Sequence, residues 1–541
     1  MTDVSVTVHS EHSHLPSQDR PLWGGLKPGP HAVGFATSFA HDYSRIYAPS
    51  PSWGASPKQL KPPRPILINV WYPAQREPMA HPLRHHQYLE LNTARDAALE
   101  AFVSGLVAFN LEVICQEVMG KRQEEMSAAE RDAFEQFLDA PTAAVRDAVP
   151  KQGPFPLVLN HQGLGGAFED NAVLFEYLAS HGYIVANSAF QSEDTSYFNV
   201  DWDLERSVKD LDSLINVLRA RPDFDLRRVG VMGQSFGGQA ALAWRAERNS
   251  MADAVVTLDS TIEYMPQDAQ GGSVGKLNER FARVERFCVP MLLFASKRSA
   301  PNFARTDALR YSERYYATVD HLQHNDYICH GAIGSDIRRQ LRPEDAEATL
   351  VRESYERICA HTLRFFDAFL KEDAGALAFL EASVMEYGAD AAPFSLRHLG
   401  AVPLPPTGAQ LADLVLTEGM DAALDVCGRL GSELREETLN DAGSLVLTQG
   451  TSAQAIPLFA KAVEMFPLSE NAHDSLGEAY AEVGDTAAAI QCYERAEGLL
   501  AADMSPSERT LSRLAQVRLV LEGIKGDSQG SAEESSAGPS L

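Results

Sequence analysis

The chain has 541 residues, of which 45% are hydrophobic and 22% charged, and these proportions are typical of a globular protein with more than one domain. Its 47 Lys and Arg residues against 74 Asp and Glu residues give a formal net charge of -27. Such a surface repels phosphate backbones and anionic lipid headgroups, which argues against a nucleic-acid-binding or membrane-surface protein.

The lack of a recognisable targeting signal and the spacing of the cysteines predict a cytoplasmic protein. The N-terminus lacks the basic start and apolar run of a secretory signal, and no apolar stretch is long enough to predict a membrane span. The cysteines are scattered without a CxxC pair, which predicts reduced, mostly buried thiols instead of disulfides or a zinc site. They are Cys115, Cys288, Cys329, Cys359, Cys427 and Cys492. The histidines at 81, 85 and 86 have no acidic or Cys partner at ligand spacing, so no metal is expected.

The first part of the chain combines strand signals with a helical segment. Residues 1–25 are predicted to be a flexible tail, and short apolar runs predict strands at 31–35 and 65–73. Residues 90–147 are rich in Ala and Glu and predict helices. We therefore expect a helical insertion over 76–150, whose apolar faces cover the active site as a lid or pocket wall.

From residue 157 onward, short apolar runs alternate with helical patterns. This alternation predicts βαβ units, and therefore a buried parallel sheet with helices on both faces. We assign the α/β domain to 26–388. The predicted strands are 157–160, 183–190, 228–233, 253–259, 290–296 and 315–322, and the predicted helices are 171–182, 203–221, 237–248 and 353–372.

The last part of the chain is predicted to be a separate helical domain. A segment with four prolines, 389–408, is the predicted linker. Beyond it, over 409–523, residues recur at an offset of 34, for example Ala442-Gly443 and Leu476-Gly477. This period, with small residues where two helices cross, resembles the tetratricopeptide repeat and suggests a protein partner; the alternative is a generic helical bundle. The Ser-, Gly- and Glu-rich end, 524–541, is predicted to be disordered.

The strongest catalytic signal is the run from Gly233 to Gly238, Gly-Gln-Ser-Phe-Gly-Gly, between a predicted strand and a predicted helix. This context is typical of a nucleophile elbow, in which a strained one-residue turn lifts a serine hydroxyl out of the sheet. Glycines fit beside such a turn because larger side chains clash there. We therefore expect Ser235 to be a nucleophile.

A serine hydroxyl needs a base. In α/β folds that carry a nucleophile elbow, the chain order of the three catalytic residues is Ser, acid, His. Three histidines follow the last predicted strands. His324 lies just past the strand and is the preferred base. His321 comes second, because a histidine inside a strand more often packs in the core, and His330 comes third.

The acid is predicted to be Asp259, at the end of a buried strand and at the carboxyl edge of the sheet, where such folds gather their sites. Many related folds take the acid one strand later, but here that strand has no carboxylate before Asp307. Glu263 is the nearest competitor. A simple loop-capping role for Asp259 is the structural alternative.

Two N–H donors are needed for the charge on the tetrahedral intermediate. We expect one from Phe236, directly after the nucleophile, and one from Leu164, in the glycine-rich loop after the strand at 157–160. The alternative for that loop is an ordinary turn.

Several motifs resemble the platelet-activating-factor acetylhydrolase (plasma and intracellular type II) and dienelactone-hydrolase branch of the α/β-hydrolases. They are KPGPHAVGF, INVWYPA, FPLVLNHQGLGG, EYLASHGYIVA, GQSFGG, VVTLD and HND, within residues 27–375. The resemblance implies an esterase that works through an acyl-enzyme, with Ser235, His324 and Asp259 as nucleophile, base and acid. It also places the second oxyanion donor at Leu164. Gln162 departs from the family's usual His-Gly, and the helical insertion and repeats lie outside the family's compact core.

The sequence thus predicts a cytoplasmic serine hydrolase of carboxylic esters, with short-chain or phospholipid-type acyl groups among its substrates and no metal or organic cofactor. The first alternative is an amidase or peptidase on the same residues. The second is a scaffold with an inactive core, which binds a protein through its repeats. The sequence leaves the oligomeric state open.

Overall fold

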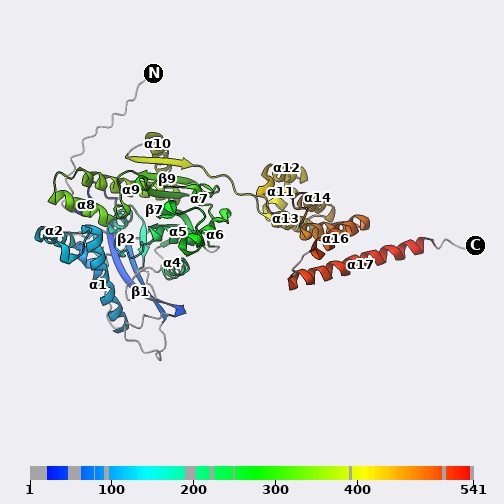
Figure 1. Ribbon diagram of the computed structural model, residues 1–541, viewed down its shortest axis with the longest axis horizontal. Helices are drawn as coiled ribbons and strands as arrows, with labels where there is room; N and C mark the ends of the chain where they lie inside the picture. Colours follow the sequence, from blue (N-terminus) through cyan, green and yellow to red (C-terminus); the bar gives the residue numbers. More distant parts are fainter. Residues whose placement is uncertain are drawn as a thin grey trace, which may run out of the picture. The chain divides into compact units, whose positions relative to one another are not determined.

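The computed structural model describes residues 21–46, 63–77, 79–90, 97–188, 203–219, 224–247, 250–388, 393–502 and 507–536. The chain divides into two compact units, Met1–Val402 and Pro403–Leu541 (Figure 1). In the described part of the chain, every helix is too short or too polar to cross a bilayer.

The first unit is built on a ten-stranded sheet with the order β10-β9-β8-β7-β6-β4-β5-β2-β1-β3. The six neighbouring strands from β9 to β5 run parallel, and β2 and β10 pair antiparallel at the two sides of this block. This arrangement, with helices on both faces, confirms the predicted α/β-hydrolase fold. The strands are β1 Ala32–Ile46, β2 Pro63–Ala74, β3 Ala144–Arg146, β4 Phe155–His161, β5 Ile184–Asn187, β6 Phe224–Gln234, β7 Ala252–Leu258, β8 Met291–Ser296, β9 Arg314–Val319 and β10 Phe394–Leu399.

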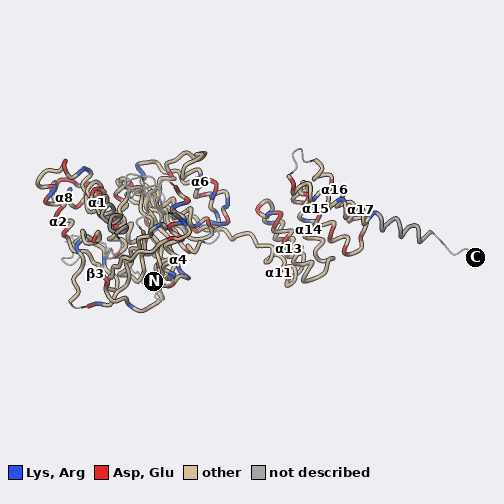
Figure 2. Tube along the Cα trace, turned by 90° about the horizontal axis from the view of Figure 1, so that it is seen from below, with Lys and Arg blue, Asp and Glu red and all other residues tan. Residues whose placement is uncertain are grey.

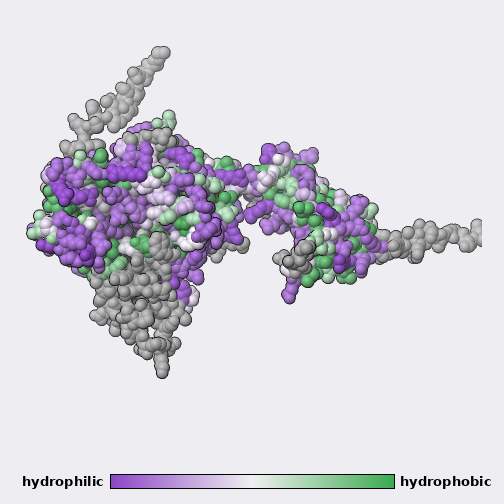
Figure 3. All heavy atoms as spheres, in the orientation of Figure 1, coloured by the Kyte–Doolittle hydropathy of each residue, from purple (hydrophilic) through white to green (hydrophobic). Residues whose placement is uncertain are grey.

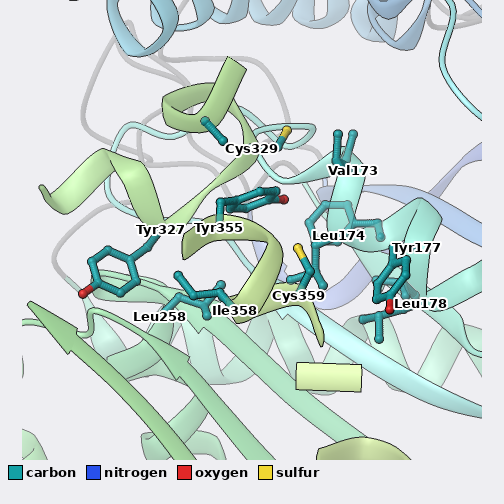
Figure 4. Close-up of a cluster of buried hydrophobic side chains, with 14 of the residues drawn as sticks. Val173, Leu174, Tyr177, Leu178, Leu258, Tyr327, Cys329, Tyr355, Ile358 and Cys359 are labelled. Atoms are coloured by element: carbon teal, nitrogen blue, oxygen red, sulfur yellow. The ribbon is translucent and has the colours of Figure 1, made fainter. Parts of the chain in front are cut away.

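Alternate residues of the strands pack into two separate hydrophobic cores, one on each face of the sheet, because successive side chains of a strand point to opposite faces. In β4, Val158 belongs to one core and Leu157 and Leu159 to the other. The first core is covered by α3 (Ala172–Ser180), α8 (Cys329–Leu341) and α9 (Ala346–Leu370). Figure 4 shows side chains of α3 and α9 packed together in it. The second core is covered by α4 (Leu204–Leu218), α5 (Phe236–Arg245) and α6 (Gly272–Phe281).

The insertion between β2 and β4 contains the two expected helices, α1 (Ala97–Met119) and α2 (Ala128–Leu138). Both pack against α8, the helix that follows the segment carrying His324. Phe134 and Phe137 of α2 are buried in the first core. The side chains of Phe102 and Leu106 lie outside the described part of the structure, and the role of the insertion as a lid stays a prediction.

Three segments are more ordered than the sequence predicts. Trp23, inside the predicted tail at 1–25, is buried and donates its indole N–H to Glu176 at 2.7 Å; residues 1–20 lie outside the described part. Residues 394–399, inside the predicted linker, form β10, because their backbone pairs with β9. The predicted tail at 524–541 begins within α17, which runs to Ser536.

The second unit consists of helical hairpins with the predicted spacing. α13 and α15 begin at Glu436 and Glu470, and α14 and α16 begin at Ser452 and Thr486, so both pairs are offset by 34 residues. A Cβ atom added at Gly443 would lie 2.5 Å from the ring of Phe459, which explains the small residue at this crossing. The helices are α11 Gly408–Thr417, α12 Met420–Leu430, α13 Glu436–Gln449, α14 Ser452–Met465, α15 Glu470–Glu482, α16 Thr486–Ala501 and α17 Glu508–Ser536.

Asp and Glu residues occur along both units (Figure 2). Hydrophilic residues dominate the visible face of the first unit (Figure 3). Of the six cysteines, only Cys288 is exposed, and all are free thiols, as the scattered spacing predicts.

Candidate active site

Ser235 occupies a strained turn between β6 and α5. Its φ of 55° and ψ of -125° lie in a region that non-glycine residues rarely adopt. A Cβ atom at Gly233 would lie 2.3 Å from the carbonyl carbon of Gly237, and one at Gly237 would lie 1.9 Å from the carbonyl oxygen of His161. The glycines are therefore required by the close approach of three backbone segments, and the turn has the geometry of a nucleophile elbow.

His324 and Asp259 form a short hydrogen-bonded pair. The Nδ1 atom of His324 lies 2.6 Å from Oδ2 of Asp259. The Asp259 side chain is 3% exposed, whereas the His324 side chain is 42% exposed. A buried carboxylate that accepts a proton-bearing Nδ1 fixes the imidazole tautomer and leaves Nε2 as a lone-pair acceptor at the open side of the ring.

Gln234, next to Ser235, links the histidine to the nucleophile turn. Its Nε2 atom lies 3.2 Å from both Nε2 and the carbonyl oxygen of His324. An amide N–H that faces His324 Nε2 agrees with the tautomer set by Asp259, because both ring nitrogens are then satisfied. His324 thus lies beside the residue that precedes Ser235 in the chain.

A strained turn also carries Asp259. Asp259 and Thr261 have φ values of 52° and 68°, and a β-branched residue in this region is a clear outlier. Gln239 of α5 holds the turn by donating to the Ser260 carbonyl and the Thr261 hydroxyl, both at 3.0 Å. Strain that is held by specific hydrogen bonds is typical of functional sites.

The loop after β4 lies close to Ser235 at Gly163. A Cβ atom at Gly163 would lie 3.3 Å from the Cβ of Ser235. The Gly166 N–H donates to the Gly163 carbonyl at 3.1 Å, and Gly165 has a φ of 74°, which is the pattern of a tight turn with glycine at its third position. Leu164 is the second residue of this turn. Phe236 is the first residue of α5, and first-turn N–H groups point out of a helix toward negative charge.

The rival residues lie in other surroundings. His321 faces α9, with Nε2 at 2.8 Å from both the Leu350 carbonyl and the Ser354 hydroxyl. Asp307 pairs with Arg397 at 2.9 Å. Glu263 is buried and accepts hydrogen bonds from the Ser260 hydroxyl at 2.9 and 3.0 Å. Burial and the charge of Asp259 raise the pKa of Glu263 to about 7, although the Ser260 bond opposes this shift.

His330, the third candidate base, belongs to a buried polar cluster between α1 and α8. Its Nδ1 atom lies 2.7 Å from Oε2 of Glu117, and its side chain is fully buried. Burial raises the pKa of Glu117 to about 8 and lowers that of His330 to about 3, so it disfavours the charged form of both groups. Burial also raises the pKa values of Glu169 and Asp170 in the same region.

Within the described residues, no three His, Cys, Asp or Glu side chains are arranged to hold a metal ion. The sequence reasoning missed three groups around the Asp259–His324 pair: the side chains of Gln234 and Tyr264 and the backbone N–H of Ser296. Gln234 could have been noticed, because it stands inside the elbow motif. Tyr264 lies in the loop after Asp259 and Ser296 at the end of β8. No local sequence pattern marks either residue as part of the site.

Comparison with known proteins yields partial matches. Residues 408–518 match the family model described as "Bacterial transcriptional activator domain". A 112-residue segment is 31% identical to mouse "Acyl-coenzyme A thioesterase 2, mitochondrial", and a match of the same length to mouse "Acyl-coenzyme A thioesterase 1" has 30% identity. Each covers 20% of this chain and 22% or 24% of the thioesterase, so the chain spans less than a quarter of the length of these relatives.

Among solved structures, the chain is similar to a ferulic acid esterase from Streptomyces cinnamoneus, with 20% identity and a TM-score of 0.44, over 68% of this chain and 97% of that one. A puromycin-hydrolyzing peptidase from Mycobacterium tuberculosis has 16% identity and a TM-score of 0.29, over 42% and 35% of the two chains.

Proposed function

We propose that the first unit is a serine hydrolase of carboxylic esters, thioesters included, and that Ser235, His324 and Asp259 are its catalytic residues. The observation that carries this proposal is the 2.6 Å bond between a buried Asp259 and His324, beside a serine in a strained elbow. The strained backbone of both Ser235 and Asp259 supports a functional reading, because such strain persists only where surrounding contacts maintain it.

The reaction begins with attack of the Ser235 Oγ atom on the carbonyl carbon of the substrate. His324 Nε2 takes the hydroxyl proton, and Asp259 stabilises the imidazolium through the Nδ1–H bond. For this step, the Ser235 hydroxyl replaces the Gln234 amide as the partner of His324 Nε2. The N–H groups of Phe236 and Leu164 stabilise the oxyanion, aided by the N-terminal end of α5.

Collapse of the tetrahedral intermediate breaks the bond between the carbonyl carbon and the leaving oxygen or sulfur. The imidazolium of His324 gives its proton to an alcohol or thiol leaving group, and the acyl group remains on Ser235. A water molecule then attacks the acyl-enzyme with His324 as the base, which releases the carboxylic acid and restores the serine. These residues accomplish the cycle without a further acid or base.

Thioesters are included because the curated relatives are named as acyl-coenzyme A thioesterases. The motif resemblance to the acetylhydrolase and dienelactone-hydrolase branch supports oxygen esters, including short-chain and phospholipid-type ones. For the second unit, we propose that the helical hairpins bind a protein partner, since a stack of such hairpins presents an extended surface.

The test compares purified wild-type protein with Ser235→Ala. Both proteins are incubated with a fluorophosphonate probe and with nitrophenyl esters of increasing acyl length, acyl-coenzyme A thioesters, and matched anilides. We expect labelling and ester or thioester cleavage in the wild type only. Labelling without ester or thioester cleavage, combined with anilide cleavage, would favour an amidase; absence of labelling would favour the inactive scaffold.

A further inference from the structure

Tyr264 lies at the far side of the Asp259 carboxylate from His324. While Oδ2 of Asp259 faces His324, Oδ1 accepts a hydrogen bond from the Tyr264 hydroxyl and one from the Ser296 backbone N–H at 3.2 Å. The Ser296 N–H also lies 2.7 Å from the Tyr264 oxygen. Each oxygen of the carboxylate therefore has its own donors, and the carboxylate plane is fixed from both sides.

We infer that Tyr264 is a positioning residue of the catalytic apparatus, which orients Asp259 and moderates its pull on the His324 proton. This inference rests on the proposed function. A donor to one oxygen of a carboxylate draws negative charge toward that oxygen, so the other oxygen attracts the imidazolium less strongly. Loss of that donor therefore strengthens the attraction between Asp259 and the imidazolium of His324.

The loop that carries Tyr264 is held rigidly by its neighbours. Arg305 is buried and donates through Nη1 to the carbonyls of Ile262 at 2.7 Å and Met265 at 3.0 Å, and through Nη2 to that of Pro266. The Glu263 carbonyl accepts the Asn302 N–H at 2.8 Å. A hydroxyl on so restrained a loop is pre-organised, and it orients Asp259 without a further loss of side-chain entropy.

The hydroxyl of Tyr264 also stays protonated throughout the working range of pH. Burial and the nearby charge of Asp259 raise the pKa of Tyr264 well above its ordinary value. It therefore acts as a permanent donor. Besides burial, the charge of Asp259 raises the pKa values of two nearby groups, Glu263 and Tyr327, the second of which lies on the segment that carries His324.

Tyr327 offers a matched control. It is a fully buried tyrosine in the same region, drawn in Figure 4 near Leu258, the residue before Asp259. Among the residues that the structure describes, its hydroxyl has no hydrogen-bond partner. Tyr264→Phe and Tyr327→Phe therefore remove the same atom from neighbouring places, but only the first removes a bond to Asp259.

The experiment measures kcat/KM against pH for the ester or thioester that the wild type cleaves best, together with melting temperature. We expect Tyr264→Phe to lower kcat/KM by about tenfold, the effect of losing one hydrogen bond to a charged group, with kcat falling and KM little changed. The acid limb of its profile should move to higher pH. Tyr327→Phe should behave like the wild type.

Glu263 could contribute its own inflection to the profile, so the pair of proteins is also compared in a Glu263→Gln background. A shift that persists there belongs to the Asp259–His324 pair and supports the inference. The inference is overturned if Tyr264→Phe matches Tyr327→Phe within twofold, if its activity falls without movement of the acid limb, or if the shift disappears in the Glu263→Gln background. A wild type that neither reacts with fluorophosphonate nor cleaves any ester or thioester instead contradicts the proposed function itself.

Discussion

Replacement of Asp259 by Asn tests the acid with minimal change of shape. In the structure, Oδ1 of Asp259 faces the backbone N–H of Ser296, which can only donate. In Asp259→Asn, an amide oxygen at the Oδ1 position keeps the hydrogen bonds from the Ser296 N–H and the Tyr264 hydroxyl, and the amide nitrogen then comes to face Nδ1 of His324. A donor at that place forces Nδ1 to become an acceptor and moves the imidazole proton to Nε2, where it blocks proton uptake from Ser235.

The expected loss follows from this tautomer change. In a serine protease, the equivalent Asp-to-Asn change lowers kcat by about 10⁴-fold, which corresponds to about 5.4 kcal/mol of transition-state stabilisation. We expect a loss of three to four orders of magnitude (~10³–10⁴) in kcat here, with little change in KM, because Asp259 is buried and pairs with His324. The assay is steady-state hydrolysis of the preferred ester or thioester, with circular dichroism and thermal melting to verify the fold.

Asp307→Asn is the control, because Asp307 is the rival acid and pairs with Arg397. We expect it to keep nearly full activity. The reasoning is refuted if Asp259→Asn retains more than about a tenth of wild-type kcat, a loss of less than about 1.4 kcal/mol, or if Asp307→Asn is the variant that loses activity.

Three other changes test the fold and the organisation of the chain. Gly237→Ala should lower the free energy of unfolding by about 3 kcal/mol, because its Cβ atom would lie 1.9 Å from a backbone oxygen. Gly400→Ala, whose Cβ atom would lie in open space, should leave the stability unchanged. Equal urea midpoints of the two variants would contradict this expectation. Because the folded pKa of Glu117 is raised to about 8 from an ordinary 4.5, the folded chain keeps a proton that the unfolded chain releases, so the contribution of Glu117 to stability falls as pH rises between these values. Glu117→Gln should reduce the decrease of unfolding free energy with pH by up to about 1.4 kcal/mol per pH unit. If urea titrations at several pH values give the same pH dependence for wild type and variant, the raised pKa of Glu117 is refuted. A chain ending at Val402 should keep its activity on small esters, because all the residues that we propose for the reaction lie in Met1–Val402; a folded but inactive product would show that the repeats contribute to the site.

Features that depend on local constraints could be predicted from the sequence. The alternation of short apolar runs with helical patterns predicted the parallel sheet, because a strand buried on both faces must be apolar throughout. The 34-residue period predicted the offset between α13 and α15 and between α14 and α16. The elbow at Ser235 could be located because its glycines, which close backbone contacts require, are neighbours in the chain.

Contacts between side chains far apart in the chain followed from the tertiary fold. The position of the predicted strand ranked His324 before His321 and His330, but the three lie within ten residues of one another, and their partners could not be predicted: they face α9 (His321), Asp259 (His324) and α1 (His330). β10 was missed because a strand at the edge of a sheet is specified by its partner β9 more than by its own residues, of which Ser395, Arg397 and His398 are polar.

The hydrogen-bond partners of Asp259 are the clearest example of contacts that local sequence patterns do not predict. Tyr264 and Ser296 contribute a hydroxyl from a loop and a backbone N–H from the end of β8, and neither contribution depends on a motif. A backbone donor carries no side-chain signature, and a tyrosine five residues after the acid reaches it only because Arg305 and Gln239 fold the loop back. Contacts of this kind arise from packing between elements, and the order of residues along the chain does not encode them in any local pattern.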